Sequence, residues 1–331
     1  MKDSLKNKCE LLIANRDAVK EAFPWENSNF YPICASFFVD CGRVADVERL
    51  KSCRQLLKSR LNVFSNFRGV SELVIVAMLA ACDQPERRID DAIEMYKKLK
   101  EHFFSSEYLP IAALILSGDV ESEKYGEICA KTRRVYDLMK ENHPFLTSSE
   151  DSVFSAMLAL TDKSDEEMVR ETETCYNILK EKFHDRNALQ SLSHVLALSD
   201  DGMRTASDKC RDTARLFDAL KEKKHKYGTG YELATLGVLA MLPCGVEETV
   251  RDIIDTSDFL KTQKGYGFWG IGKQQRLMHA GMIVTSEHLG VSDAMHGAAI
   301  GSTLSLIAAQ QAATCAAIAA SVAASNAAAH S

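Results

Sequence analysis

Hydrophobic and polar positions divide the chain into two kinds of segment that alternate. One kind is amphipathic: in residues 88–96, Ile89, Ala92, Ile93 and Tyr96 recur at the spacing of one helix face, and most of the other positions are charged. The other kind is shorter and almost uncharged, over residues 74–81, 109–116, 153–160, 189–198 and 233–242. Its abundance of Ala, Leu and Met and its weak alternation favour helix over strand. The pattern therefore predicts half-exposed helices that alternate with buried ones.

The amphipathic segments share an ending, aromatic-x-x-Leu-Lys or a variant of it, that recurs about every 40 residues. The leucine position is held by Leu99, Met139, Leu179, Leu220 and Leu260. A lysine in the last turn faces the negative end of the helix dipole, so it needs no ligand to explain it. A signal for the start of a helix supports the helical interpretation, because residues 164–167 fit a capping box.

A two-helix repeat of this length is typical of helical solenoids. No linker rich in Pro, Gly or Ser interrupts the series. The sequence therefore predicts an all-α protein in which residues 1–290 form one domain of tandem helical hairpins, arranged as an α/α superhelix or toroid.

Composition places the chain among soluble globular proteins, with 46% hydrophobic and 26% charged residues. The net charge of −6 provides no basic footprint, so nucleic-acid binding is disfavoured. Ten cysteines are scattered without a Cys-x-x-Cys pair, and the first ten residues lack the apolar run of a secretory signal. We expect a cytoplasmic protein.

Residues 291–331 differ from the rest of the chain, because they are rich in alanine and nearly uncharged. The high helix propensity of alanine predicts a C-terminal helix. A membrane span is disfavoured by the scarcity of large apolar residues and by Gln310 and Gln311. Three placements stay open: packing on or near the repeat domain, self-association through a thin apolar seam, or a frayed tail.

The most unusual local sequence is a loop rich in glycine and aromatic residues at 264–273. Its glycines match the Gly-x-Gly-x-x-Gly pattern of nucleotide-binding loops, but that pattern requires a preceding strand, and residues 250–261 have a helical pattern. Nucleotide binding is therefore disfavoured. The loop is either a structural turn or a weak anion site at the start of the next helix. The candidate ligand-binding residues of that anion site are Trp269, Gly270, Gly272, Lys273 and Arg276.

An acidic residue lies near the start of four apolar segments, at Glu72, Glu107, Asp151 and Glu232. If the apolar helices converge, Glu72, Asp151 and Glu232 are candidates for general acid–base catalysis. The favoured alternative is that each acid stabilises the first turn of its helix, where capping and the helix dipole both favour a carboxylate.

The nine histidines show no His-x-x-x-His or His-Glu-x-x-His spacing, and no Gly-x-Ser-x-Gly nucleophile motif occurs. We therefore expect no metal site and no cofactor.

Four stretches together resemble an uncharacterised bacterial family, the proteins grouped as domain of unknown function 4003. The stretches are residues 67–73, 228–233, 265–273 and 310–313. The resemblance implies a bacterial origin, and it assigns no chemistry to any residue.

Two hypotheses for the function follow. The leading one is a helical-repeat scaffold or binding protein that recognises a protein segment or a small anionic ligand. The alternative is an α/α-toroid enzyme that uses the carboxylates at the starts of the buried helices. Of the two hypotheses, the sequence favours a protein without enzymatic activity.

Overall fold

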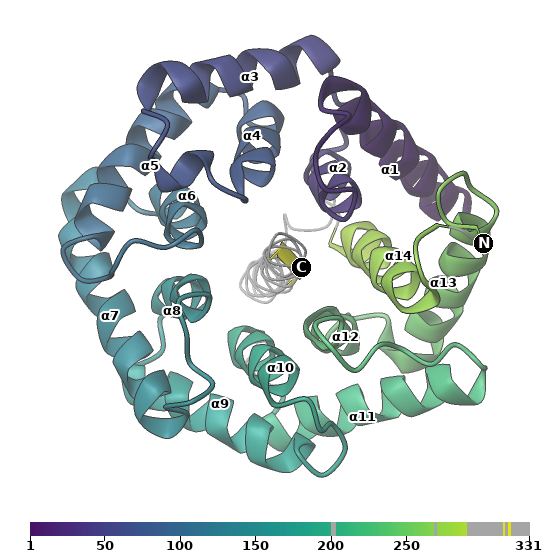
Figure 1. The fold of residues 1–331 in the computed structure, drawn as a ribbon. Helices are drawn as coiled ribbons and strands as arrows, with labels where there is room; N and C mark the ends of the chain where they lie inside the picture. The colour runs from purple at the N-terminus through teal and green to yellow at the C-terminus, as the bar shows by residue number, and fades with distance from the viewer. Residues whose placement is uncertain (200–202, 268–269, 290–313, 315–316, 319–331) are drawn as a thin grey trace. The chain divides into compact units, whose positions relative to one another are not determined.

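The protein is all-α, as the hydrophobic pattern predicted. The computed structural model describes residues 1–199, 203–267 and 270–289, together with residues 314, 317 and 318. Over this part of the chain it contains α-helices and two short 3-10 turns, and no strand (Figure 1). None of the helices described is both long and apolar enough to cross a membrane.

The chain divides into two compact units. Unit 1 consists of Met1–Ile13 and Arg170–Ala317, and unit 2 consists of Ala14–Val169 and Ile318–Ser331. Two helices contribute to both units: α1 (Asp3–Ala22) and α9 (Asp165–Leu179).

Unit 2 is built from two rows of helices. The largely buried row places α2, α4, α6 and α8 side by side, and the half-exposed row places α3, α5 and α7 against it. Figure 1 shows these rows as an inner and an outer layer of the unit. The helices are α2 (Phe30–Asp40), α3 (Val47–Arg60), α4 (Glu72–Ala81), α5 (Pro85–Leu99), α6 (Leu109–Asp119), α7 (Tyr125–Asn142) and α8 (Asp151–Ala159), with 3-10 turns at Asn66–Arg68 and Ser122–Lys124.

Unit 1 repeats this two-row design. Its buried row is α10, α12 and α14, and α11 packs beside α13 in the half-exposed row. The helices are α10 (Arg186–Leu198), α11 (Ala206–Glu222), α12 (Leu233–Ala240), α13 (Gly245–Lys261) and α14 (Lys273–His288). The first residues of α1 join this unit, where Lys8 Nζ donates to the carbonyl oxygen of Ser286 over 2.7 Å.

The repeated helix ending has a packing role. The five residues at its leucine position are all buried, so each half-exposed helix fixes its last turn in the core. The predicted capping box is also confirmed: Ser164 N–H donates to the carboxylate of Glu167 over 3.1 Å, and Glu167 N–H donates to Ser164 Oγ over 3.3 Å.

The apolar buried helices cannot satisfy their own last carbonyl groups, and basic side chains from half-exposed helices or their connecting loops do so instead. Arg49 Nε donates to the carbonyl oxygen of Ala80 over 2.7 Å, and Lys131 Nζ donates to that of Thr161 over 2.8 Å. In unit 1, Arg204 donates in the same way to the end of α12. These hydrogen bonds join the two rows of helices where the buried helices end.

Most of the alanine-rich segment, and with it the predicted boundary between residues 290 and 291, lies outside the described residues. The three residues described there, Thr314, Ala317 and Ile318, are buried and helical.

Candidate interaction surface

Four loops of unit 2 each expose one aromatic side chain almost completely. They connect a half-exposed helix to the next buried helix, at residues 23–29, 61–71, 100–108 and 143–150. The side chains are Trp25, Phe64, Phe104 and Phe145, with exposed fractions of 97%, 92%, 96% and 99%. Successive members are 39, 40 and 41 residues apart, so they recur with the period of the repeat. Such recurrence is not expected of scattered surface residues.

The loops that carry these side chains are fixed by hydrogen bonds or by buried aromatic residues. The hydroxyl group of Tyr31 donates to the carbonyl oxygens of Phe23 and Glu26 in the first loop, and Lys140 Nζ donates to that of Thr147 in the fourth. Phe67 is fully buried and packs edge-to-face on Tyr96, with ring centroids 5.1 Å apart. Phe103 packs in the same way on Tyr136 at 5.4 Å. Since Phe103 is held in the core, the adjacent Phe104 is directed to solvent. The exposed rings therefore stand on anchored loops.

Hydrogen bonds connect the first three loops along one edge of unit 2. Arg54 donates to the carboxylates of Glu26 and Glu72, both over 2.5 Å, and so joins the loop before α2 to the start of α4. Ser71 Oγ donates to the carbonyl oxygen of Glu107 over 3.0 Å, which joins the loops before α4 and α6.

The fourth loop continues the same edge. Burial and, next, the negative charge of Glu150 raise the pKa of Tyr108 to about 12. The helices α6 and α8 also pack together. The four loops thus form one surface at the N-terminal ends of the buried row, which we call the aromatic edge.

The two edges of unit 2 differ in charge and in apolar exposure. Of the described residues in the opposite loops, only Val44 is a large exposed hydrophobic side chain. The last turns of the half-exposed helices place Lys58, Arg60, Lys97, Lys98 and Lys140 beside the aromatic edge. Their first turns place Glu48, Glu86, Glu127, Asp165, Glu166 and Glu167 at the other edge.

Glu72, one of the predicted acid–base candidates, lies at the start of α4 and takes part in an ion-pair network. Its carboxylate accepts a hydrogen bond from Arg54 and lies 3.9 Å from Arg68 Nε. The guanidinium of Arg54 also stacks over the ring of Phe23, 4.6 Å from the ring centroid. Glu72 therefore joins adjacent hairpins through Arg54.

Asp151 has the most perturbed carboxylate of the three candidates. Burial raises its pKa to about 7, while the backbone N–H of Ser148, which donates to Oδ2 over 2.8 Å, opposes that rise. This hydrogen bond closes the turn that precedes α8. Between Glu72 and Asp151 lies α6, because α4 packs on α6 and α6 packs on α8.

Glu232, the third candidate, belongs to unit 1. Burial raises its pKa, and hydrogen bonds from its own backbone and from that of Gly230 act in the opposite direction. The carboxyl group fills the space beside Gly228, where a Cβ atom would lie only 2.4 Å from it. Glu232 thus holds the turn before α12.

The candidate residues of the glycine-rich loop are placed differently from one another. Lys273 Nζ donates to the carbonyl oxygen of Lys224 over 2.5 Å. Arg276 is buried and lies at hydrogen-bond distance from Ser257 and Tyr266. Both basic groups therefore bind other parts of unit 1. Gly270 and Gly272 are exposed, and Trp269 lies outside the described residues.

Comparison with known proteins identifies the family. A family model described as protein of unknown function (DUF4003) matches residues 15–312. The chain belongs to this family. The chain is also similar to the uncharacterized protein YeaA of Bacillus subtilis (strain 168), with 24% identity over 306 residues, which cover 89% of each chain. None of the solved structures compared with this chain matches it. The function of this DUF4003 protein is therefore unknown.

The sequence hypotheses for this DUF4003 protein did not include the aromatic edge. A signal was present, because Trp25, Phe64, Phe104 and Phe145 follow the same period as the buried leucines. A sequence pattern does not distinguish an anchored aromatic from an exposed one, and pairs such as Phe103 and Phe104 contain both.

Proposed function

We propose that this protein is a helical-repeat binding protein that recognises a protein segment through the aromatic edge of unit 2. The observation that carries the proposal is the row of four exposed aromatic side chains on anchored loops. Aromatic side chains are enriched at protein interfaces, because each transfers a large apolar area out of water when it enters a partner's pocket.

The extent of the row favours a macromolecule over a small ligand. Neighbouring helices pack about 8–10 Å apart, so three intervals place the first and last rings about 25–30 Å from each other. A small anionic ligand cannot contact rings that are so widely spaced. An extended or helical segment of a partner protein can contact several of them.

Charge indicates the composition of that segment. Lys58 and Lys97 lie in the helix turns that lead into the aromatic loops. Lys98 pairs with Glu101 over 3.1 Å, and Lys140 donates to the carbonyl oxygen of Thr147 over 3.0 Å. An apolar segment with acidic flanking residues would complement this edge, and the acidic opposite edge would repel it. We therefore propose a partner segment that combines apolar anchor pockets with negative charge.

The enzyme alternative has less support. Glu72, Asp151 and Glu232 each have a local partner that closes a turn or joins two hairpins. No second function is proposed from these carboxylates.

A combined variant tests the aromatic edge: Trp25→Ser, Phe64→Ser, Phe104→Ser and Phe145→Ser together. The full chain is used as bait in a bacterial lysate, and crosslinks are mapped by mass spectrometry. We expect a partner whose crosslinks lie in the four loops and which the combined variant no longer retains. The control is Val44→Ser with Met203→Ser, which removes exposed apolar side chains from other loops and should retain the partner.

Three results would overturn the proposal. The first is an identical set of partners for the wild type and the combined variant. The second is sedimentation with anionic phospholipid vesicles that the combined variant loses, which would make the edge a membrane-docking surface. The third is a dimer in light scattering that the combined variant converts to a monomer, which would make the edge a contact between copies.

A cytoplasmic location and a packed C-terminal segment also belong to this proposal. All nine cysteines that the structure describes are free thiols, which fits a reducing compartment. The burial of Thr314 and Ile318 supports packing over self-association for the alanine-rich segment. Cell fractionation tests the location. Light scattering of a chain truncated near residue 290 tests the packing, because an unchanged oligomeric state would exclude self-association through this segment.

A further inference from the structure

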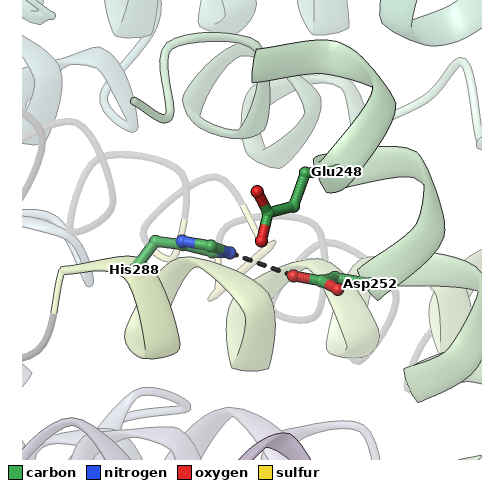
Figure 2. Close-up of side chains that lie close together, drawn as sticks. All are labelled: Glu248, Asp252 and His288. Carbon is green, nitrogen blue, oxygen red and sulfur yellow. Dashed lines mark hydrogen bonds and ion pairs between the residues drawn. The ribbon is translucent and has the colours of Figure 1, made fainter. Parts of the chain in front are cut away.

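Two carboxylates and one imidazole meet in unit 1 between α13 and α14 (Figure 2). Glu248 and Asp252 are four residues apart on α13, so they lie on one face of that helix. His288 ends α14, and its Nε2 lies 3.1 Å from Asp252 Oδ2. One ligand atom from each of the three residues lies within 4.8 Å of the other two.

A positive charge already lies between the two carboxylates. Lys2 Nζ donates to Glu248 Oε1 over 2.6 Å and to Asp252 Oδ2 over 2.8 Å. Asp252 is only 2% exposed, so its charge requires a close positive partner. The ammonium group of Lys2 supplies that partner from the start of the chain.

We propose that Glu248, Asp252 and His288 form a site for a first-row divalent metal ion, and that the ammonium group of Lys2 competes with the metal for the two carboxylates. This site is independent of the aromatic edge, which belongs to unit 2.

The ligand types select the class of metal. Two carboxylate oxygens and one imidazole nitrogen suit Mn²⁺, Fe²⁺ or Zn²⁺, whereas Ca²⁺ and Mg²⁺ are bound by oxygen ligands. His288 must present an unprotonated nitrogen to the metal, so any proton carried by Nε2 leaves when the metal binds.

The surrounding charges allow the exchange. A divalent ion neutralises the two carboxylates, whereas Lys2 neutralises one negative charge. The side chain of Lys2 is 38% exposed and can withdraw into water. Arg251 is a second cation near the cluster, 3.5 Å from Glu248 and 3.8 Å from Asp252, and its side chain is 61% exposed. The N-terminal part of α1 would keep its contact through Lys8, so the metal would release Lys2 alone.

Titration calorimetry of the untagged full chain with Mn²⁺ tests this site, after treatment with a chelator. Mn²⁺ is the better probe, because the thiol of Cys244 beside His288 and the exposed thiol of Cys41 would also bind Zn²⁺. We expect Lys2→Gln to tighten Mn²⁺ binding about tenfold, which corresponds to about 1.4 kcal/mol. We expect Glu248→Gln and His288→Gln, each in the Lys2→Gln background, to weaken binding at least about tenfold.

Glu247→Gln in the Lys2→Gln background is the matched control, since Glu247 precedes Glu248 on α13 but is 86% exposed and outside the cluster. It should leave Mn²⁺ affinity unchanged. The proposal is overturned if the Lys2→Gln protein binds no Mn²⁺ or binds it no more tightly than the wild type. It is also overturned if the Glu248 and His288 substitutions leave the affinity unchanged while circular dichroism reports a folded chain.

Discussion

Arg54 Nε donates a hydrogen bond of 2.5 Å to Glu72 Oε1, and the two residues lie on successive helices of unit 2. The same guanidinium binds Glu26 in the preceding loop. Exposure of the Arg54 and Glu72 side chains is 24% and 11%, so this ion pair is largely shielded from water. Glu72 therefore contributes to the packing of adjacent hairpins, and its charge is matched locally.

Loss of Arg54 should destabilise unit 2 strongly. Arg54→Met leaves Glu72 buried beside Arg68, with its nearest guanidinium at 3.9 Å, and we expect a loss of about 3 kcal/mol in the free energy of unfolding. Urea denaturation followed by circular dichroism measures it. The double variant Arg54→Met with Glu72→Met should recover most of the loss, because it removes the unpaired charge as well.

Arg60→Met is the control for that experiment. Arg60 pairs with Asp90 over 2.8 Å, but their side chains are 42% and 52% exposed. We expect this substitution to cost less than about 1 kcal/mol. Equal losses from Arg54→Met and Arg60→Met would contradict the role assigned to Glu72.

Asp151 should make stability depend on pH. Its pKa in the folded chain, about 7, lies above the ordinary value of 3.8, so the folded state binds more protons than the unfolded state between these values. Stability contributed by protonated Asp151 is therefore complete below about pH 4 and is lost as the pH rises through 7, by up to about 4 kcal/mol.

Asp151→Asn removes this titration but keeps an oxygen that accepts the Ser148 N–H. We expect the variant to be more stable than the wild type at pH 8 and to lose less stability between pH 5 and pH 8. Urea midpoints at several pH values measure the difference. Parallel pH profiles for the two proteins would show that the carboxyl group is ionised in the folded chain at neutral pH.

Gly237 should be sensitive to a single added methyl group. It lies in α12, where a Cβ atom would come within 2.7 Å of Leu192 Cδ1 and 3.2 Å of Val195 Cγ1 in α10. Gly237→Ala should therefore cost about 1–3 kcal/mol by overpacking the contact between these buried helices. Gly126→Ala in α7 meets no atom within 4 Å and should be neutral or slightly stabilising. Thermal unfolding of both variants checks the contrast, and similar melting temperatures would argue against close packing at Gly237.

The sequence alone determined the class of fold and the length of its repeat. The spacing of Ile89, Ala92 and Tyr96 and the recurrence of Leu99, Met139 and Leu179 were sufficient, because amphipathic periodicity reports which face of a helix is buried. The capping box at residues 164–167 was also readable, since capping is a local interaction between residues three apart.

Tertiary structure decided which of the polar and aromatic residues have partners. The sequence placed Glu72 at a helix start, but only packing brings Arg54 to it from the preceding helix. The cluster of Glu248, Asp252 and His288 escaped the sequence motifs, because His288 comes from a different helix 36 residues after Asp252. Likewise, Phe103 and Phe104 are residues of the same type and are adjacent in the chain, yet Phe103 is buried and Phe104 is exposed. Contacts between distant residues fix these differences, and a local pattern does not contain them.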